Sequence, residues 1–130
     1  MNSMNRLFCI RGAVCTENNA DAIIKNVELL FNTILKENDI SNEKDFVSIQ
    51  FTVTTDIDEL NPAAALRRGK QSVDVTHIPL FCSQEPVMKN SLKNVIRIMV
   101  TVYLPEQSEI HSVYLNGAEV LRPDLVRGNL

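Results

Sequence analysis

The chain has 130 residues, of which 45% are hydrophobic and 22% charged, and this composition fits one folded domain over residues 1–130 rather than a disordered chain. Its 13 basic and 16 acidic residues give a net charge of −3, which excludes a general nucleic-acid binder. The sequence has no apolar run of about 18 residues, so we expect no membrane span. Residues 1–6 and 126–130 are expected to be flexible ends.

Three cysteines, Cys9, Cys15 and Cys82, form an odd set without a Cys-x-x-Cys pair. This pattern favours a reducing, cytoplasmic compartment and predicts neither a disulfide framework nor a metal site. The apolar stretch near the N-terminus is too short for a signal peptide, which agrees with a cytoplasmic location.

The first half of the chain predicts a strand, a long helix and a second strand. Leu7 to Val14 is the first strand, and residues 20–36 place apolar side chains at helical spacing after Asn19, a good helix cap. Residues 45–54 alternate as a strand does. We expect one face of that strand to comprise Val47, Ile49, Phe51 and Val53, and the other Phe46, Ser48, Gln50 and Thr52.

The second half predicts a short helix and several strands. Asn61 and Pro62 open the helix and Gly69 ends it. Residues 73–81 follow as a third strand, and residues 95–104 form the most apolar strand, which we place at the centre of the sheet.

A β-hairpin is predicted at the end of the chain. Residues 112–115 and 118–121 are apolar runs on either side of Asn116-Gly117, a strong hairpin signal. The element order gives an α/β fold with a mixed sheet and its helices on one face. The other face would then need a partner, so we expect an oligomer.

Four arginines suggest a site for a small polycarboxylate. Arg97 lies between two isoleucines in the most apolar strand, and Arg11 ends the first strand. Arg67 and Arg122 complete the set. Arginine binds carboxylates with two parallel hydrogen bonds and stays charged when desolvated. Each arginine could instead pair with one of the acidic residues, but Arg97, with its apolar neighbours, favours a ligand.

Glu85, Cys82 and Tyr114 are weaker candidates. Glu85 follows the third strand, where a carboxylate can orient a hydroxyl or simply be solvated. Cys82 lacks a histidine at a helpful spacing, and Tyr114 is an ordinary strand residue whose hydroxyl could reach a carboxylate. No sequence pattern of a catalytic triad or of a phosphate-binding loop is present.

Several motifs occur in an order that resembles a known enzyme family. They are IRGA at residues 10–13, PAAALR at 62–67, CSQE at 82–85, IRIMVTV at 96–102 and LRPDL at 121–125. Together they resemble the small trimeric α/β (AroH) class of chorismate mutases. The resemblance implies a pseudo-α/β-barrel homotrimer with active sites at subunit interfaces. It also implies conversion of chorismate to prephenate in aromatic amino-acid biosynthesis without a cofactor.

The same resemblance implies a role for each matching residue. Arg97 would face the ether oxygen of the breaking bond, Glu85 and Cys82 would contact the ring hydroxyl, and Arg11 and Tyr114 would hold a carboxylate. The further substrate-binding positions that it implies are Arg67, Arg122, Ala63, Asn61, Phe81 and Leu121.

The chain departs from the family pattern at a few of these positions. Asn61 stands where an aromatic side chain is expected, and Phe81 stands where a small hydroxyl residue is expected. Ala64 replaces an expected lysine, and residues 86–91 lack the expected glycines. We hypothesise that Phe81 partly compensates for the missing aromatic group, which requires its ring to face the site.

Two other functions remain open from the sequence. Imine deaminases of the Rid/YjgF type form a similar trimeric α/β fold around an arginine that grips a carboxylate. Alternatively, the departures mark a non-catalytic module that binds a small carboxylate. The LRPDL motif and the pair Glu85 and Arg97 favour the mutase over both.

Overall fold

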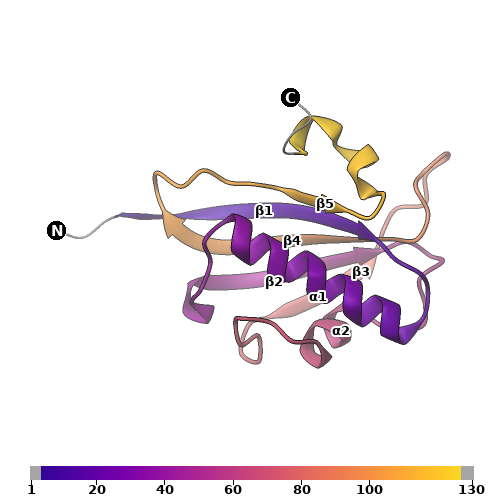
Figure 1. Cartoon of the computed structure of the whole chain (residues 1–130), viewed down its shortest axis with the longest axis horizontal. Helices are drawn as coiled ribbons and strands as arrows, with labels where there is room; N and C mark the ends of the chain where they lie inside the picture. Colours follow the sequence, from indigo (N-terminus) through magenta and orange to yellow (C-terminus); the bar gives the residue numbers. More distant parts are fainter. Residues whose placement is uncertain (1–3, 127–130) are drawn as a thin grey trace.

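A computed structural model describes residues 4–126, which form a five-stranded mixed sheet and two α-helices (Figure 1). The strands, in the sheet order β3-β2-β4-β1-β5, are β1 (Asn5–Cys15), β2 (Phe46–Val53), β3 (Leu80–Gln84), β4 (Val95–Pro105) and β5 (Val113–Leu115). The helices are α1 (Ala20–Glu37) and α2 (Pro62–Arg68), with short 3-10 helices at Glu43–Asp45, Ala118–Leu121 and Pro123–Leu125. The predicted α/β class is confirmed, and β4 is the central strand, as expected.

The predicted flexible ends fall largely on residues 1–3 and 127–130, which lie outside the described residues. Asn5 and Arg6 belong to β1, where they pair with Pro105 and Leu104 of β4. None of the described helices is both long and apolar enough to cross a membrane.

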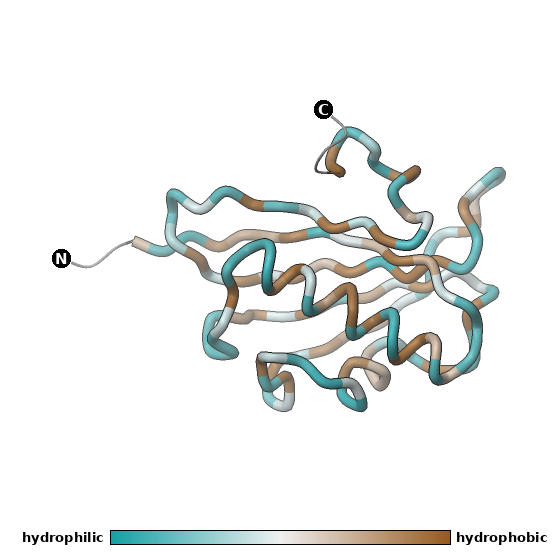
Figure 2. Tube along the Cα trace, viewed as in Figure 1, coloured by the Kyte–Doolittle hydropathy of each residue, from teal (hydrophilic) through white to brown (hydrophobic). Residues whose placement is uncertain are grey.

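The long helix α1 forms where its apolar spacing predicts it. The Asn19 side chain accepts a hydrogen bond from the Ala22 backbone N–H at 2.8 Å, which caps the helix. Asp21 in the first turn and Lys36 in the last turn complement the helix dipole. The apolar residues recur along one side of the helix (Figure 2), and those buried against the sheet are Ile23, Val27, Leu30, Phe31, Ile34 and Leu35.

The alternation expected for β2 is wrong at its first residues. The pairing of β2 with β4 shifts register between Phe46 and Ser48, a β-bulge. The bulge places Phe46 in the core, where its ring centroid lies 6.0 Å from that of Phe31, and leaves Val47 exposed. From Ile49 onward the predicted faces hold.

The third strand begins later than predicted. Residues 73–79 form a loop, and the strand covers Leu80–Gln84. Asp74 accepts hydrogen bonds from Thr76 and so turns the backbone out of a strand. Val73 and Val75 are nevertheless buried in the core, so the apolar residues of this segment belong to a buried loop rather than to a strand.

The predicted hairpin is also wrong. Asn116 and Gly117 do form a turn with positive φ values of 55° and 101°. However, β5 pairs in parallel with β1, and residues 118–121 form a 3-10 helix instead of a strand. The Glu119 carboxylate accepts a hydrogen bond from the Gly117 N–H at 2.7 Å and thereby favours the helical turn.

The sheet has two unlike faces. On the covered face, buried apolar residues pack beneath α1 and α2, among them Ile10, Ile49, Phe51, Ile96, Ile98 and Val100. The alternate residues form the open face, among them Leu7, Cys9, Arg11, Gln50, Thr52, Arg97, Met99 and Tyr103. The C-terminal segment, yellow in Figure 1, lies beside β5 and away from both α-helices. It packs on the end of the open face around Ala13 and Tyr114.

Candidate active site

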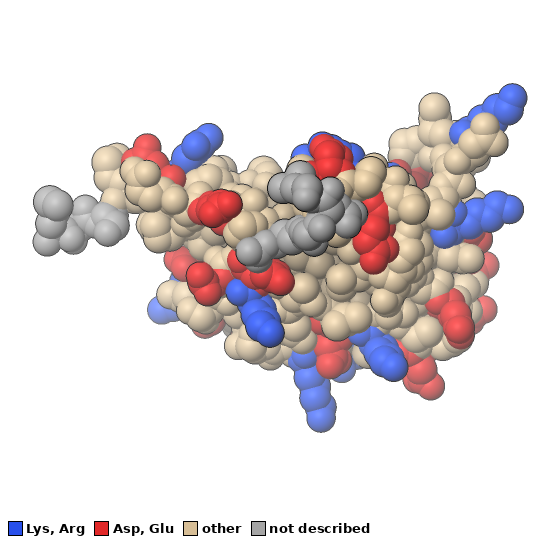
Figure 3. Space-filling model, turned by 45° about the horizontal axis from the view of Figure 1, so that its top comes forward, with Lys and Arg blue, Asp and Glu red and all other residues tan. Residues whose placement is uncertain are grey.

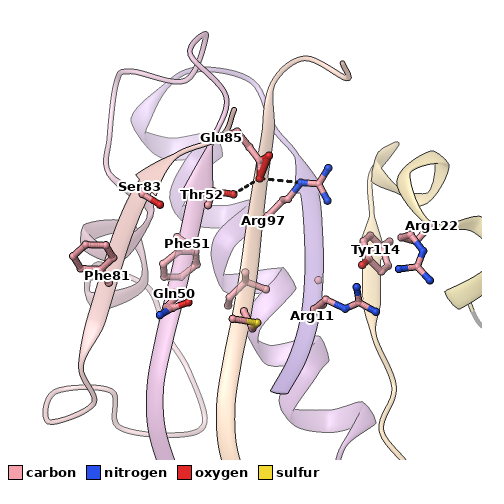
Figure 4. Close-up of a pocket in the computed structure, with 13 residues that line it drawn as sticks. Arg11, Gln50, Phe51, Thr52, Phe81, Ser83, Glu85, Arg97, Tyr114 and Arg122 are labelled. Atoms are coloured by element: carbon pink, nitrogen blue, oxygen red, sulfur yellow. Dashed lines mark hydrogen bonds and ion pairs between the residues drawn. The ribbon is translucent and has the colours of Figure 1, made fainter. Parts of the chain in front are cut away.

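A cavity of about 500 Å³ lies on the open face (Figure 4). It gathers side chains from several strands and from the segment that follows β5. The sequence-predicted site residues that line it are Arg11, Phe81, Glu85, Arg97, Tyr114 and Arg122. Residues far apart in the sequence therefore converge at one place.

Arg97 and Glu85 form an ion pair in the lining of this cavity. The Arg97 Nε atom lies 3.1 Å from Glu85 Oε1, and their side chains are 41% and 20% exposed. The Nε atom is buried and has no well-aligned hydrogen-bond acceptor among the described residues. Because this atom is buried, a ligand would reach Arg97 through the rest of its guanidinium group.

Glu85 is fixed from β2 as well. Its backbone N–H donates to the Val53 carbonyl oxygen at 2.8 Å, which continues the parallel pairing of β3 with β2. The Thr52 hydroxyl donates to Glu85 Oε1 at 2.6 Å. Thr52 and Arg97 are cross-strand partners on β2 and β4, so the register itself brings the three side chains together.

Arg11 enters the cavity from β1, beside a glycine that the packing requires. A Cβ atom at Gly12 would lie 2.7 Å from the Val113 carbonyl oxygen and 3.2 Å from side-chain atoms of Ile98 and Leu30. Gly12 thus lets β5 and α1 approach β1 closely. This approach places Tyr114 of β5 next to the Arg11 side of the cavity.

Arg122 follows the 3-10 helix after β5 and is held by a neighbouring carboxylate. Its Nε and Nη2 atoms bond the two Asp124 carboxylate oxygens at 3.0 and 2.8 Å. These hydrogen bonds raise the pKa of Arg122 and lower the pKa of Asp124. Figure 4 shows Arg11, Tyr114 and Arg122 on the same side of the cavity, so positive charge gathers there.

The other side of the cavity includes residues that the sequence did not single out. They are Gln50, Thr52, Ser83 and Met99. The alternation of β2 had already put Gln50 and Thr52 on one face, but nothing in the sequence gives the cross-strand register. Phe81 lines this side and is 66% exposed, so its position allows the compensation hypothesised for it.

Besides Leu121, four predicted site residues do not line the cavity of this chain: Cys82, Asn61, Ala63 and Arg67. Cys82 points from β3 toward the core, and its burial raises the pKa of the thiol. Asn61 caps α2 by accepting a hydrogen bond from the Ala63 N–H at 2.8 Å. Ala63 is buried and Arg67 is exposed on α2, which packs near β3 at the edge of the sheet. Their expected roles therefore stay predictions.

Leu121, the remaining predicted residue, lines a smaller cavity of about 250 Å³ that Glu85 and Arg97 share. Within residues 4–126, no group of three potential metal-ligating side chains is present. Acidic and basic side chains are mixed on the face seen in Figure 3. Arg11, Arg97 and Arg122 line one cavity, where Glu85 pairs with Arg97 and Asp124 with Arg122.

Comparison with known proteins identifies the family. The sequence profile of "Chorismate mutase type I" matches residues 7–125. The protein named chorismate mutase AroH from Bacillus subtilis (strain 168) is 36% identical over 120 residues, covering 89% of this chain and 90% of the relative. The protein of that name from Thermus thermophilus is 32% identical over 118 residues, covering 89% and 93%.

A solved structure agrees with these relatives. A chorismate mutase from Clostridium thermocellum matches with a TM-score of 0.76 and 36% identity, over 87% of this chain and 98% of that chain. None of these matches supports an imine deaminase or a non-catalytic binding module. With a profile match over nearly its whole length and relatives above 30% identity, the chain belongs to the chorismate mutase type I family.

Proposed function

We propose that the chain is a chorismate mutase, an isomerase that rearranges chorismate to prephenate in aromatic amino-acid biosynthesis, and that the reaction takes place in the open-face cavity. One observation carries the proposal. The Arg97–Glu85 pair, with its Nε–Oε1 distance of 3.1 Å, lies in a cavity that Arg11, Tyr114 and Arg122 also line. The family of the chain supplies the reaction.

The charges of the cavity suit the substrate. Chorismate is a dianion, and its enolpyruvyl arm must fold over the ring before the reaction can occur. Arg11 offers a planar guanidinium group that can bind a carboxylate. Arg122 offers the N–H groups that Asp124 does not use, and the Tyr114 hydroxyl offers a further donor. Holding both ends of the substrate in the compact conformer accelerates the reaction through proximity and orientation.

Arg97 is the group that we assign to the chemical step. The rearrangement breaks a carbon–oxygen bond and forms a carbon–carbon bond within one molecule, so it transfers no proton and needs no cofactor. The ether oxygen gains negative charge as its bond lengthens. A fixed cation at that oxygen stabilises the transition state more than the ground state. Glu85, an acceptor of hydrogen bonds, is assigned to the ring hydroxyl.

We also propose that the enzyme is a homotrimer whose active sites lie between subunits. The open face exposes the apolar side chains of Leu7 and Tyr103, each 45% exposed, and a second copy docked there would bury them. Asn61 and Arg67, which lie outside the cavity of their own chain, could then complete the site of a neighbouring subunit.

The direct test is turnover of chorismate by the purified chain. The reaction is followed through the loss of the ring diene absorbance, and the product is identified as prephenate by chromatography. Saturable turnover well above the buffer blank is the expected result. A rate equal to the blank, with the protein folded and its oligomeric state measured by light scattering, would reject the function.

Shared sites are tested by mixing two inactive variants, Arg97→Ala and Arg67→Ala. If each site takes Arg97 from one subunit and Arg67 from the next, random mixed trimers contain about a quarter intact sites. Unfolding and refolding the two variants together should then restore activity. Sites built within single chains would give no recovery, and that result would contradict the interface proposal.

We further propose a cytoplasmic location. Cys9, Cys15 and Cys82 are free thiols, as a reducing compartment would keep them. Cell fractionation with detection of the tagged protein tests this, and recovery outside the cytoplasm would contradict it.

A further inference from the structure

Thr52 contacts the Glu85–Arg97 pair, although the sequence around it does not indicate a role in the site. Its hydroxyl lies 2.6 Å from Glu85 Oε1, the same oxygen that lies 3.1 Å from Arg97 Nε (Figure 4). We infer that Thr52 is a positioning residue, which fixes the Glu85 carboxylate and, through it, the Arg97 guanidinium. The inference rests on the proposed chorismate mutase function.

The two contacts engage one of the two oxygens of the Glu85 carboxylate and leave the other for the substrate. A hydroxyl carries one proton, and Thr52 donates it to Oε1 of Glu85. Oε1 therefore has a donor from β2 and a cation from β4, and both contacts leave Oε2 for the ring hydroxyl of the substrate. The carboxylate can then meet the substrate without releasing Arg97.

Thr52 is a rigid support, whereas Glu85 is not. Thr52 pairs with Arg97 on one side and with Ser83 on the other, in the interior of the sheet. Its β-branched side chain has few accessible rotamers. Glu85 lies just beyond β3, where its backbone N–H bonds Val53, while its terminal torsion is soft. The Thr52 hydrogen bond is what restrains that torsion.

Loss of the hydroxyl should weaken the chemical step more than substrate binding. The freed carboxylate can rotate, and Arg97 can follow it away from the reacting oxygen, whereas Arg11 and Arg122 stay in place on the other side of the cavity. Transition-state stabilisation by a preorganised cation depends on its position within a fraction of an ångström. A fall in kcat with little change in KM is the signature of this role.

The test compares Thr52→Val, which removes the hydroxyl but keeps the shape, with Thr52→Ser, which keeps the hydroxyl. Thr101→Val is the matched control, because Thr101 is also a half-buried threonine of the open face but does not line the cavity. For each variant we would measure kcat and KM with chorismate, the oligomeric state and the thermal unfolding temperature.

We expect Thr52→Val to lower kcat about tenfold with KM within twofold of wild type, while Thr52→Ser and Thr101→Val stay close to wild type. A Thr52→Val enzyme with wild-type kcat would overturn the inference, and so would a Thr52→Ser enzyme as slow as Thr52→Val. If Thr52→Val and Thr101→Val lowered both kcat and the unfolding temperature to the same extent, that result would also overturn the inference. If the wild-type protein showed no turnover, that result would instead reject the proposed function on which the inference rests.

Discussion

Neighbouring residues of the same strand lie on opposite faces of the sheet, and their surroundings differ accordingly. Ile96 points to the covered face and is fully buried, whereas the Arg97 side chain points to the open face and is 41% exposed. Gly12 and Arg11 divide in the same way on β1. The period of a β-strand thus separates the side chains that pack in the core from the charged side chains that line the candidate site.

The difference explains how a central strand can hold an arginine. On the covered face an unpaired charge would be buried beneath α1 and would cost several kcal/mol. On the open face Arg97 meets Glu85 and solvent, so its cost is small. Substitutions on the covered face should therefore change the free energy of unfolding, and those on the open face should change catalysis.

The first prediction concerns Arg11 on the open face. Arg11→Ala removes a charged donor from the cavity and should lower kcat/KM, mainly by raising KM. The expected loss corresponds to about 1.5–3 kcal/mol of binding free energy. Arg6→Ala is the control, because Arg6 belongs to the same strand but stacks over Phe8 at 5.1 Å. Steady-state kinetics with chorismate would measure both. Equal kinetics for the two variants would contradict the assignment of Arg11 to substrate binding.

Gly12 supplies the complementary prediction for the covered face. Gly12→Ala forces a Cβ atom to within 2.7 Å of the Val113 carbonyl oxygen, and such overpacking costs about 1–3 kcal/mol of unfolding free energy. Urea unfolding followed by circular dichroism would measure the loss. A variant as stable as wild type would show that β5 and α1 do not approach β1 this closely.

Ile96 should show a smaller effect of the same kind. Ile96→Val removes one buried methylene and should lower the free energy of unfolding by about 0.5–1.5 kcal/mol. Its kcat should equal that of wild type, because the side chain points away from the cavity. A changed kcat with unchanged stability would break the division between the two faces.

Cys82 gives the mildest expected effect. Burial raises the pKa of this thiol, so at neutral pH less of it is thiolate than in an ordinary cysteine. Alkylation at about pH 7.5 should be slower at Cys82 in the folded protein than in the urea-unfolded chain, and its rate in the folded protein should keep rising as the pH is raised toward the elevated pKa. Mass spectrometry of timed labelling measures the rate at Cys82, and equal rates in the folded and unfolded protein would contradict its placement against the core.

The sequence predicts the covered face better than the site. Helical spacing located α1, alternation located most of β2, and apolar runs located β1 and β4, because burial of apolar residues follows the secondary structure of each element. The strand predictions failed in residues 73–79 and 118–121, where a loop and a 3-10 helix bury apolar side chains without forming strands. Burial of apolar residues alone does not distinguish a strand from a buried loop or a 3-10 helix.

The site was predicted through its charges and through motif resemblance. Arg97 and Arg11 were conspicuous because they interrupt apolar strands. Thr52 and Gln50 were missed because their place in the cavity depends on the cross-strand register, which pairs Thr52 with Arg97. Register results from bulges and strand order, such as the shift at Phe46, and no local pattern in the sequence encodes it.

The central claim is that Arg97 stabilises the transition state from the open face. Its most direct test measures chorismate turnover and urea unfolding for wild type, Arg97→Ala and Arg97→Lys on the same preparations. The account predicts that Arg97→Ala loses about 3–4 kcal/mol of transition-state stabilisation, a hundred- to a thousand-fold fall in kcat, and that Arg97→Lys, which keeps the charge but loses the planar fork, is also poor. Unfolding free energies should stay within about 1 kcal/mol of wild type. A folded Arg97→Ala enzyme that retains most of its kcat would contradict the account.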